Sequence, residues 1–374
     1  MPKFLIHPAD LQKRRKRCAA EGARLRKLPR DLVTSCNICS SPRHVLVSDD
    51  DRYGLPFRSA LCLDCGLLYL VDRFTFSGYS EFYGSGSYRT VSCQFNGVAH
   101  SLAHVQADQV SYGRILTRVL SGFVPRQRQG KLLDVGGSAG IITREVVKEF
   151  GLQGTVLDPA TDEVAAARAA GLEAIVGSLE DWQTDQKFDL ILLCRSIEHL
   201  FDLRFSLARI RSLLNPGGLF YVDIADFMEM CRMVGAPKTF AKADHCYWLT
   251  QSTALDIFRA VGFSLVSMNI VSGFGYVGFL LRPCEPVAAF ASSTTRILDQ
   301  VEEIQSLERE WTDFGATSQG PADWLHRKAY RVKRNMLRLL PARKKQSELL
   351  ASAVPVVPAV PVPAIPNPSK AHNG

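Results

Sequence analysis

The sequence has no long apolar run. None of its hydrophobic stretches approaches the roughly 18 consecutive apolar residues of a membrane-spanning helix, and the N-terminal residues contain no hydrophobic signal core. These absences argue against a helical membrane protein, and we expect the chain to reside in the cytoplasm. A hydrophobic content of 46% over 374 residues is typical of a globular protein with a large core.

Basic charge is concentrated at the two ends of the chain. The formal net charge is +8, yet ten Lys and Arg residues fall within residues 1–30 and nine more within residues 325–346. We expect residues 1–30 to form a basic arm with only partial order. Both ends have the composition of solvated segments, and the alternative is contact with an anionic partner, which could be nucleic acid, anionic lipid or acidic polysaccharide.

Two C-x-x-C pairs give a strong metal-binding signal. They are Cys36 with Cys39 and Cys62 with Cys65, and 22 residues separate the pairs. Each pair can place two thiolates on one side of a turn, so together they predict a tetrahedral zinc site. Four thiolates close the coordination sphere, which indicates structural rather than catalytic zinc. Gly66 directly follows the last thiolate and suits a turn with positive φ.

An aromatic cluster follows the second pair. It consists of Tyr79, Phe82, Tyr83 and Tyr88. Our interpretation is that these rings pack the cysteine-rich segment against the next domain, and the alternative is a platform for substrate.

From residue 131 onward, short apolar runs alternate with segments of helical periodicity. This alternation predicts a parallel sheet with helices on both faces. The expected strands are 131–135, 154–157, 173–176, 188–194, 219–224, 264–270 and 276–281, and the expected helices are 141–150, 161–170, 203–214 and 253–261.

The first of these strands runs into a turn of very small residues, Asp134 to Gly140, and then directly into a helix. Backbone N–H groups at such a turn are open to a polar ligand. The dinucleotide fingerprint G-x-G-x-x-G does not fit, because its second and third positions hold Ser138 and Ile141. Asp158 lies 24 residues after Asp134, at the end of the second expected strand.

In order and spacing, these features resemble the class I S-adenosylmethionine-dependent methyltransferases. The resemblance covers about residues 130–282 and includes Asp134 to Gly140, Asp158, Phe188-Asp189, Glu198-His199-Leu200, Leu214 to Gly218 and Gly262-Phe263. It implies a Rossmann-like sheet, with a small zinc-ribbon-like domain in front and a helical extension and disordered tail behind.

The resemblance also implies a binding site for S-adenosylmethionine. Asp158 would accept hydrogen bonds from the ribose hydroxyls, and the segment after the third strand would frame the adenine. Ser138 replaces a glycine of the family pattern, and we expect it to keep a negative φ. The implied cofactor-binding residues are Asp134, Gly136, Gly137, Ser138, Gly140, Asp158, Ser178, Leu179, Glu180 and Arg195.

His199 and His245 are the candidate catalytic residues. Ligands of this fold bind beyond the carboxyl ends of the strands, which places residues 194–200 beside the methyl group. A histidine has a pKa near neutrality and suits the role of general base, if the acceptor holds a proton. The alternative for each histidine is a structural role, as a helix cap or in packing against the cofactor.

A cysteine-rich zinc unit, a tyrosine-rich link and a methyltransferase core occur in the same order in nucleotide-sugar C-methyltransferases and polysaccharide-pathway methyltransferases, which this chain resembles. Those C-methyltransferases continue into a further α/β domain, whereas this chain continues into expected helices at 287–314 and 322–340 and a Pro/Ala/Val-rich tail. We therefore expect a small-molecule or glycan acceptor, methylated at oxygen rather than carbon. The expected units are 1–30, 31–95, 96–284, 285–346 and 347–374.

Two other classes remain open at this point. An RNA methyltransferase would explain the zinc unit and the basic ends. Base-amino methyltransferases carry an Asn/Asp-Pro-Pro-aromatic motif after the fourth strand, where this chain has Cys194 to Ile197, so only ribose or ring-carbon chemistry fits. The other class is a non-catalytic protein that binds S-adenosylmethionine as a scaffold.

Overall fold

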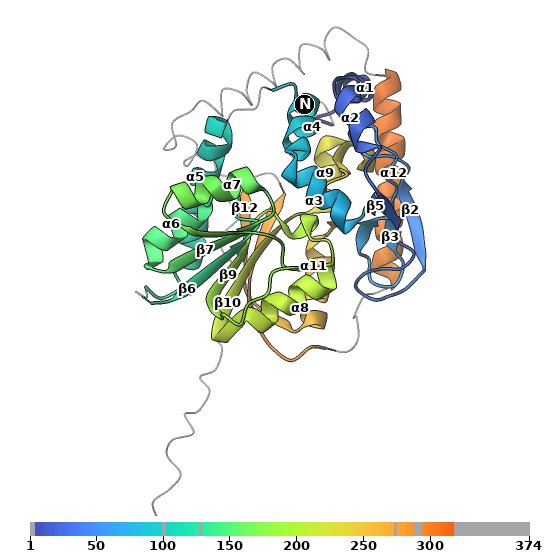
Figure 1. The fold of residues 1–374 in the computed structure, drawn as a ribbon. Coiled ribbons are helices and arrows are strands. Elements are labelled where there is room, and N and C mark those ends of the chain that lie inside the picture. Colours follow the sequence, from blue (N-terminus) through green and yellow to red (C-terminus); the bar gives the residue numbers. More distant parts are fainter. Residues whose placement is uncertain (1–3, 99–101, 127–128, 273–274, 288–293, 318–374) are drawn as a thin grey trace, which may run out of the picture.

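The protein is organised around a seven-stranded mixed sheet, seen in a computed structural model that describes residues 4–98, 102–126, 129–272, 275–287 and 294–317 (Figure 1). The strand order is β12-β13-β10-β9-β6-β7-β8. The strands are β6 (Lys131–Val135), β7 (Gln153–Asp158), β8 (Glu173–Val176), β9 (Phe188–Leu193), β10 (Leu214–Ala225), β12 (Phe263–Ser272) and β13 (Tyr276–Pro283).

Five of these strands are parallel, and the last two form an antiparallel hairpin at one edge. β6 lies between β7 and β9, and the sequence order reverses there, which is where open α/β sheets bind ligands. The Rossmann-like fold expected from the sequence is confirmed. β10 begins earlier than expected, since Leu214 already pairs with Phe188 before an irregular stretch ends at Leu219.

Helices cover both faces of the sheet. On one face, Leu132, Leu190 and Leu192 pack against α5 (Leu102–Leu120) and α6 (Ile141–Phe150), and Val156 packs against α7 (Thr161–Ala169). The alternate residues Leu133 and Ile191 face the other pair of helices. This other pair is α8 (Leu203–Leu213) and α11 (Gln251–Val261).

The cysteine-rich segment forms a small sheet that we call the cysteine unit (residues 30–74). Its order is β11-β4-β3-β2, so one strand comes from far along the chain: Tyr247 pairs with Tyr69 and Trp248 with Leu68. The unit is therefore joined by backbone hydrogen bonds to the segment that follows β10 and α10 along the chain. The strands are β1 (Arg30–Leu32), β2 (His44–Ser48), β3 (Ser59–Cys62), β4 (Leu68–Leu70), β5 (Asp72–Phe74) and β11 (Tyr247–Trp248).

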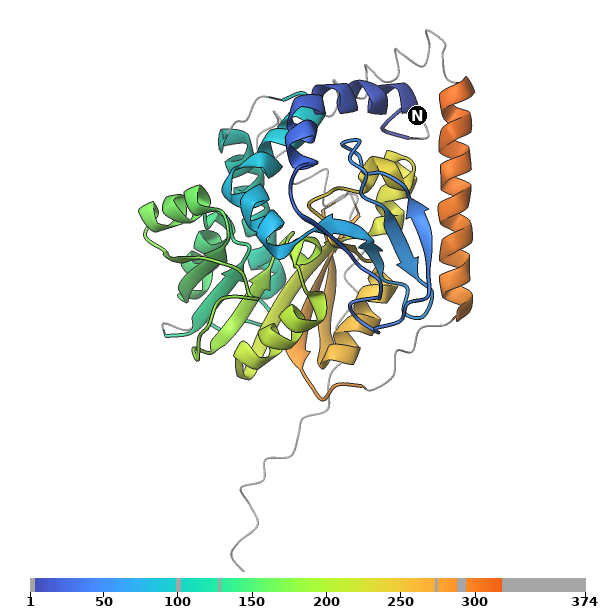
Figure 2. The same ribbon diagram turned by 45° about the vertical axis from the view of Figure 1, so that its right-hand side comes forward.

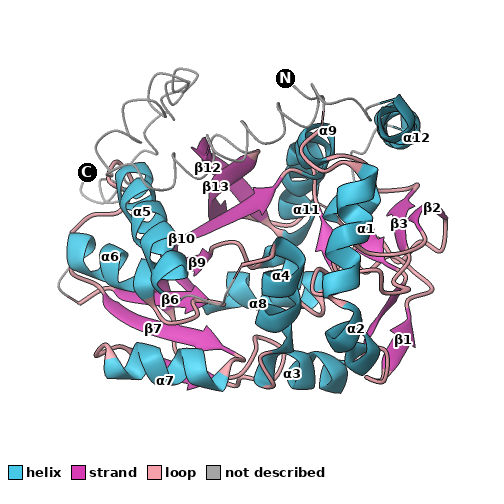
Figure 3. Cartoon of the chain, turned by 90° about the horizontal axis from the view of Figure 1, so that it is seen from above, coloured by secondary structure: helices cyan, strands magenta, loops and turns pink. Residues whose placement is uncertain are grey.

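Short helices surround the carboxyl edge of the main sheet, as the view from above shows (Figure 3). Two of them follow the cysteine unit along the chain, one follows β9, and two follow β10. They are α3 (Phe76–Gly84), α4 (Ser87–Asn96), α9 (Phe227–Val234), α10 (Pro237–Phe240) and the 3₁₀-helix Ile197–His199.

The basic N-terminal segment is ordered, so the expectation of partial order was wrong. It forms α1 (Pro8–Arg17) and α2 (Ala19–Leu25), and Phe4, Leu11 and Leu25 are buried. The few apolar residues suffice because each lies against the rest of the core. Several arginines are bound within the protein as well, since Arg15 pairs with Asp50.

The last described helix, α12 (Thr294–Thr317), stands along the outer edge of the cysteine unit (Figure 2). Trp311 is buried there and donates its Nε1–H to the carbonyl of Ile6 at 2.7 Å. The helix expected at 322–340 and the Pro/Ala/Val-rich tail lie outside the described residues. Within the described ranges, no helix has both the length and the apolar character needed to cross a membrane.

Candidate active site

The turn after β6 surrounds a buried carboxylate. Asp134 is 1% exposed, and its Oδ2 accepts a hydrogen bond from the Thr143 hydroxyl at 2.7 Å. Its Oδ1 has no hydrogen-bond partner among the described residues. Burial raises the pKa of Asp134 to about 7. An orphaned buried acceptor is costly, so this atom fits a cationic or hydrogen-donating ligand group such as the amino group of S-adenosylmethionine.

A cavity of about 130 Å³ lies directly beside Asp134, and we call it the turn cavity. Gly136, with φ of 70°, lines it together with Gly137 and Ser196. A Cβ at Gly136 would lie only 2.5 Å from the Ser196 hydroxyl, so the bare backbone keeps this space open. Of the expected cofactor residues, the turn cavity brings together Asp134, Gly136, Gly137 and Arg195.

Asp158 holds the same turn from the neighbouring strand. Its two carboxylate oxygens accept from the backbone N–H groups of Ser138 and Ala160, both at 2.8 Å. Each oxygen keeps a second lone pair, so the contact expected with ribose hydroxyls is compatible with these bonds. Burial raises the pKa of Asp158.

Ser138 has φ of 52°, so the negative φ expected for it was wrong. A left-handed non-glycine residue costs about 1 kcal/mol, and here its Oγ donates to Glu163 at 2.6 Å. Glu163 also pairs with Arg89 of α4. This contact ties α4 to the rim of the turn. At the end of the turn, Gly140 has φ of 68° and directly precedes α6.

The segment after β8 is placed differently from the cofactor-binding role implied for it. Glu180 Oε1 accepts from the Phe201 N–H at 3.1 Å and from the Ser206 hydroxyl at 2.9 Å, so this oxygen anchors the start of α8. Leu179 is 2% exposed within the core. Ser178 bonds with Asp181 and forms a capped turn. None of the three lines the turn cavity or the larger cavity beside it.

A second cavity of about 350 Å³ adjoins the first, and we call it the large cavity. Arg195 lines both, and its guanidinium lies 4.7 Å from the Tyr112 ring centroid and 5.0 Å from that of Tyr276. His199 and His245 both line the large cavity. The two candidate bases and the glycine turn therefore line neighbouring cavities that share Arg195.

Hydrogen bonds fix the tautomer of His199. Its Nδ1 lies 2.8 Å from the carbonyl oxygen of Asp244 and 2.9 Å from the Tyr83 hydroxyl. A carbonyl oxygen only accepts, so Nδ1 carries the proton and Nε2 holds the free lone pair. Burial lowers the pKa of His199, which keeps the ring neutral and basic near neutral pH.

His245 lies edge-on to His199, with ring centroids 4.7 Å apart. It is 6% exposed, and its buried Nδ1 has no partner among the described residues. Burial, and then the positive charge of Lys242, hold the pKa of His245 well below its usual value.

Asp244 lies between the two histidines and Lys242. Burial alone would raise the pKa of Asp244, but the charges of Lys242 and His199 outweigh it and leave the pKa lowered. His199, Asp244 and His245 lie close enough together for a metal ion. However, the Lys242 ammonium is 3.6 Å from Asp244 Oδ2 and already neutralises this carboxylate, which disfavours a second cation there.

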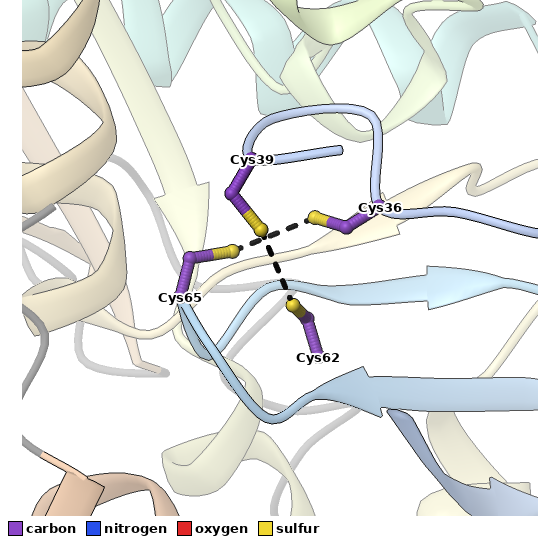
Figure 4. A group of neighbouring side chains, drawn as sticks. All are labelled: Cys36, Cys39, Cys62 and Cys65. Carbon is purple, nitrogen blue, oxygen red and sulfur yellow. Dashed lines mark hydrogen bonds between the residues drawn. The ribbon is translucent and has the colours of Figure 1, made fainter. Parts of the chain in front are cut away.

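The four predicted cysteine ligands converge on one point (Figure 4). The Sγ atoms of Cys36 and Cys65 are 3.5 Å apart, as are those of Cys39 and Cys62, and all four lie within 4.8 Å of one another. Four sulfurs at about 2.3 Å from a tetrahedral zinc would be ~3.8 Å apart, so the arrangement fits the ion. All four are free thiols, and Gly66 has the expected positive φ of 76°.

The turn between Cys36 and Cys39 docks the cysteine unit on α8. The Asn37 side chain donates to Asp202, and its oxygen accepts from the N–H of Arg204 at the start of α8. The Arg204 guanidinium also donates to the carbonyl of Ile38 at 2.9 Å. A zinc ion that rigidifies this turn would therefore also stabilise the contact with α8.

Sequence reasoning missed several residues of the large cavity. Arg52 comes from the loop between β2 and β3, Lys242 precedes His245, and Glu198 precedes His199. Glu198 is only 4% exposed, and this burial raises its pKa to about 7, although the hydrogen bond that it accepts from the Ala225 N–H acts in the opposite direction. Glu198 and Lys242 stood beside predicted residues in the sequence, whereas no sequence signal brought Arg52 to the site. Tyr83 packs among the aromatic residues as expected and also contacts His199.

Comparison with known proteins agrees with this geometry. Residues 106–268 match the family model described as "Methyltransferase domain". The matched residues include strands β6 to β10 of the main sheet and the glycine turn after β6.

Among curated proteins, the chain is 32% identical over 95 residues to a ubiquinone biosynthesis O-methyltransferase of Nitrobacter winogradskyi, covering 24% of this chain and 36% of that protein. It is 25% identical over 192 residues to the protein of the same name from Rhizobium leguminosarum bv. trifolii, covering 49% of this chain and 71% of that one. A solved S-adenosylmethionine-dependent methyltransferase from Clostridium acetobutylicum aligns with a TM-score of 0.41 at 12% identity, over 53% of this chain and 99% of that one. The chain spans little more than a third of the length of the first of these relatives.

Proposed function

We propose that the protein transfers a methyl group from S-adenosylmethionine to a hydroxyl oxygen of a sugar, nucleotide-sugar or glycan acceptor. One observation carries the proposal: the large cavity contains a histidine with an available ring nitrogen and joins the glycine-turn cavity through Arg195. When bound, S-adenosylmethionine would supply an electrophilic methyl group.

The turn cavity is the proposed position of the cofactor. Asp134 Oδ1 would accept from the amino group, and the bare backbone of Gly136 and Gly137 would allow close approach. Asp158 would accept from the ribose hydroxyls with its remaining lone pairs. Ser138 and Gly140 shape the turn itself, and Arg195 separates the cofactor from the acceptor.

His199 is the proposed general base. A hydroxyl must lose its proton as the new bond to carbon forms, and His199 Nε2 is the ring nitrogen whose lone pair is free. Tyr83 and the Asp244 carbonyl orient the ring through Nδ1. His245 would pack against this ring as a neutral partner, because its pKa is held well below the ordinary value.

Two lines support an oxygen acceptor of the sugar class. The curated relatives are named ubiquinone biosynthesis O-methyltransferases, so they support oxygen as the acceptor atom and name no sugar. The sugar class is supported by the cysteine unit with its tyrosine-rich link, which resembles the front part of sugar-modifying methyltransferases. The volume of the large cavity, about 350 Å³, lies within the range of small-molecule sites. Structural zinc held by the four cysteines would fix the unit that closes this cavity.

The test is transfer of label from S-adenosylmethionine into fractionated cell extract. We expect label in nucleotide sugars or polysaccharide, and loss of more than about tenfold in turnover for His199→Ala. His245→Ala separates the two histidines: a comparable loss would move the role of base to His245. If neither substitution lowers turnover by about tenfold, catalysis by these bases is the wrong mechanism.

RNA is the alternative acceptor, and a salt-sensitive RNA gel shift with the purified protein separates it from the sugar class. Some basic residues of the N-terminal segment form hydrogen bonds within the protein: Arg17 donates to the carbonyls of Gln94 and Phe95, and Arg26 donates to that of Gly54. This packing favours a small acceptor. Binding of S-adenosylmethionine without formation of S-adenosylhomocysteine, with any acceptor, would instead indicate a scaffold.

A further inference from the structure

Arg52 is an unusual residue within the large cavity. It is partly buried and stacks on Phe95, with its guanidinium carbon 4.1 Å from the ring centroid. Its Nε is buried and has no hydrogen-bond partner, and its guanidinium forms no close ion pair among the described residues. Removing a cation from water without a partner is costly, so such a group is typical of a site that receives an anion.

Further positive groups line the same cavity. Lys242 is partly buried, and burial lowers its pKa although the nearby charge of Asp244 opposes this shift. The Arg195 guanidinium is held over Tyr112 and Tyr276 and forms no hydrogen bond or ion pair within the described ranges. Two carboxyl groups, Asp10 and Glu198, face these cations. Together with Arg14, these cations outnumber the two carboxyl groups, so the lining carries an excess of positive charge even though Lys242 pairs with Asp244.

The loop that carries Arg52 is fixed against the segment that carries the histidines. The Arg52 N–H donates to the carbonyl of Ala241 at 2.8 Å, and the neighbouring Asp51 accepts from the Ala243 N–H at 2.9 Å. Asp51 is 0% exposed and also accepts from the N–H of Tyr53. The cysteine unit thus holds one arginine rigidly beside Lys242 and His245.

We propose that Arg52, delivered by the cysteine unit, binds an oxyanion group on the methyl acceptor, either a phosphate or a carboxylate, together with Lys242. This inference rests on the proposed function, because it assigns the large cavity to the acceptor. The planar guanidinium presents paired donors that match both oxyanions. The cysteine unit then determines which acceptor binds, in addition to any structural role of its metal.

The experiment measures binding of three probes to the full-length protein by calorimetry: inorganic pyrophosphate, glucuronate and neutral glucose. The variants are Arg52→Gln, Arg52→Lys and the matched control Arg58→Gln. Arg58 lies in the same unit but pairs with Asp72 and is partly exposed. Zinc content and circular dichroism verify that each variant folds.

We expect one of the two anions to bind, and Arg52→Gln to weaken it by at least about tenfold. Arg52→Lys should recover part of the affinity, and Arg58→Gln should match the unaltered protein. Binding of pyrophosphate alone identifies a phosphate, and binding of glucuronate alone identifies a carboxylate. Failure of both anions to bind, or equal binding by Arg52→Gln and Arg58→Gln, overturns the inference.

Binding of S-adenosylmethionine is measured in parallel and separates this inference from the proposed function. If the cofactor fails to bind while Arg52 still governs anion affinity, the proposed function is wrong and the anion site stands. If the cofactor binds and label is transferred while the anions do not bind, only the anion site is wrong.

Discussion

As the proposed base, His199 offers one ring nitrogen, because the other is held by Asp244 and Tyr83. Its pKa is lowered by burial from the ordinary value of 6.5. The active form of a base is unprotonated, so activity should be retained as the pH falls to 6.5 and be lost only below it. The acidic limb of kcat/KM against pH is therefore expected to have its midpoint below 6.5.

His199→Ala should abolish this limb and lower turnover by more than about tenfold. His44→Ala, a histidine of β2 in the cysteine unit, serves as the control and should leave the profile unchanged. A midpoint above 6.5, or a limb that survives in His199→Ala, would assign the titration to another group.

We expect Asp158 to contribute to cofactor binding by a separate route. Asp158→Ala removes the acceptor of the Ser138 and Ala160 N–H groups as well as the expected ribose contact. Hydrogen bonds to a charged group contribute about 1.5–3 kcal/mol each, so affinity for S-adenosylmethionine should fall by at least about tenfold. Calorimetry measures this loss, with the exposed Asp162→Ala as control. Equal affinity of the two variants would contradict the assignment.

At the scale of elements, the cysteine unit contacts the elements around the main sheet at three places: β11 on β4, Asn37 at the start of α8, and Asp51 on the segment before His245. Loss of its metal should therefore affect the large cavity. Cys36→Ser should release the zinc, because three thiolates leave an incomplete site. We expect the KM for the acceptor to rise more than the Kd for S-adenosylmethionine, since Arg52 loses its position.

Cys93→Ser is the control for this change, because Cys93 lies on α4 and not in the cluster of four. Elemental analysis should find one equivalent of zinc in this control and none in Cys36→Ser. Retention of zinc by Cys36→Ser would remove the metal assignment itself.

Much of this arrangement was accessible from the sequence, and the reasons differ by element. The strands of the main sheet are short apolar runs bounded by Gly and Asp, a pattern that depends only on local burial. The glycine turn and the cysteine pairs were legible because their chemistry requires fixed spacing. The pairing of β11 with β4 was not, since two residues such as Tyr247-Trp248 carry no strand signal of their own.

The same distinction applies to the candidate site. His199 was found because it follows a strand of the sheet, where this fold binds ligands, whereas His245 was chosen for its side chain, in the segment before the helix expected at 253–261. Arg52 lies almost 150 residues before His199, and only tertiary packing through Asp51 brings it there. Glu180 was expected near the adenine, but the free N–H groups at the start of α8 compete for its carboxylate.

At the scale of the whole molecule, the two ends of the described chain meet. The N-terminal residues Phe4 to Ile6 line the large cavity, and Trp311 of α12 holds Ile6 in place through its carbonyl. The Trp311 ring also covers Gly235 after α9. The wall of the cavity thus depends on contacts between segments about 300 residues apart.

Trp311→Ala should therefore destabilise the protein by about 3–5 kcal/mol, as expected for loss of a buried aromatic side chain. Urea unfolding measures this change. The control is Leu298→Ala on the same helix, which is 53% exposed and should change stability by less than about 0.5 kcal/mol. Similar midpoints for the two variants would show that α12 is not part of the cooperative structure.

The central claim is methyl transfer to oxygen in the large cavity. It is tested most directly by incubating the protein with S-adenosylmethionine labelled with ¹³C in its methyl group, fractionating the sugar-containing acceptors, and recording NMR spectra of the product. The account predicts a methyl resonance in the O-methyl region, present with the unaltered protein and strongly reduced with His199→Ala. A C-methyl or N-methyl resonance, or an O-methyl product formed equally by His199→Ala, would contradict it.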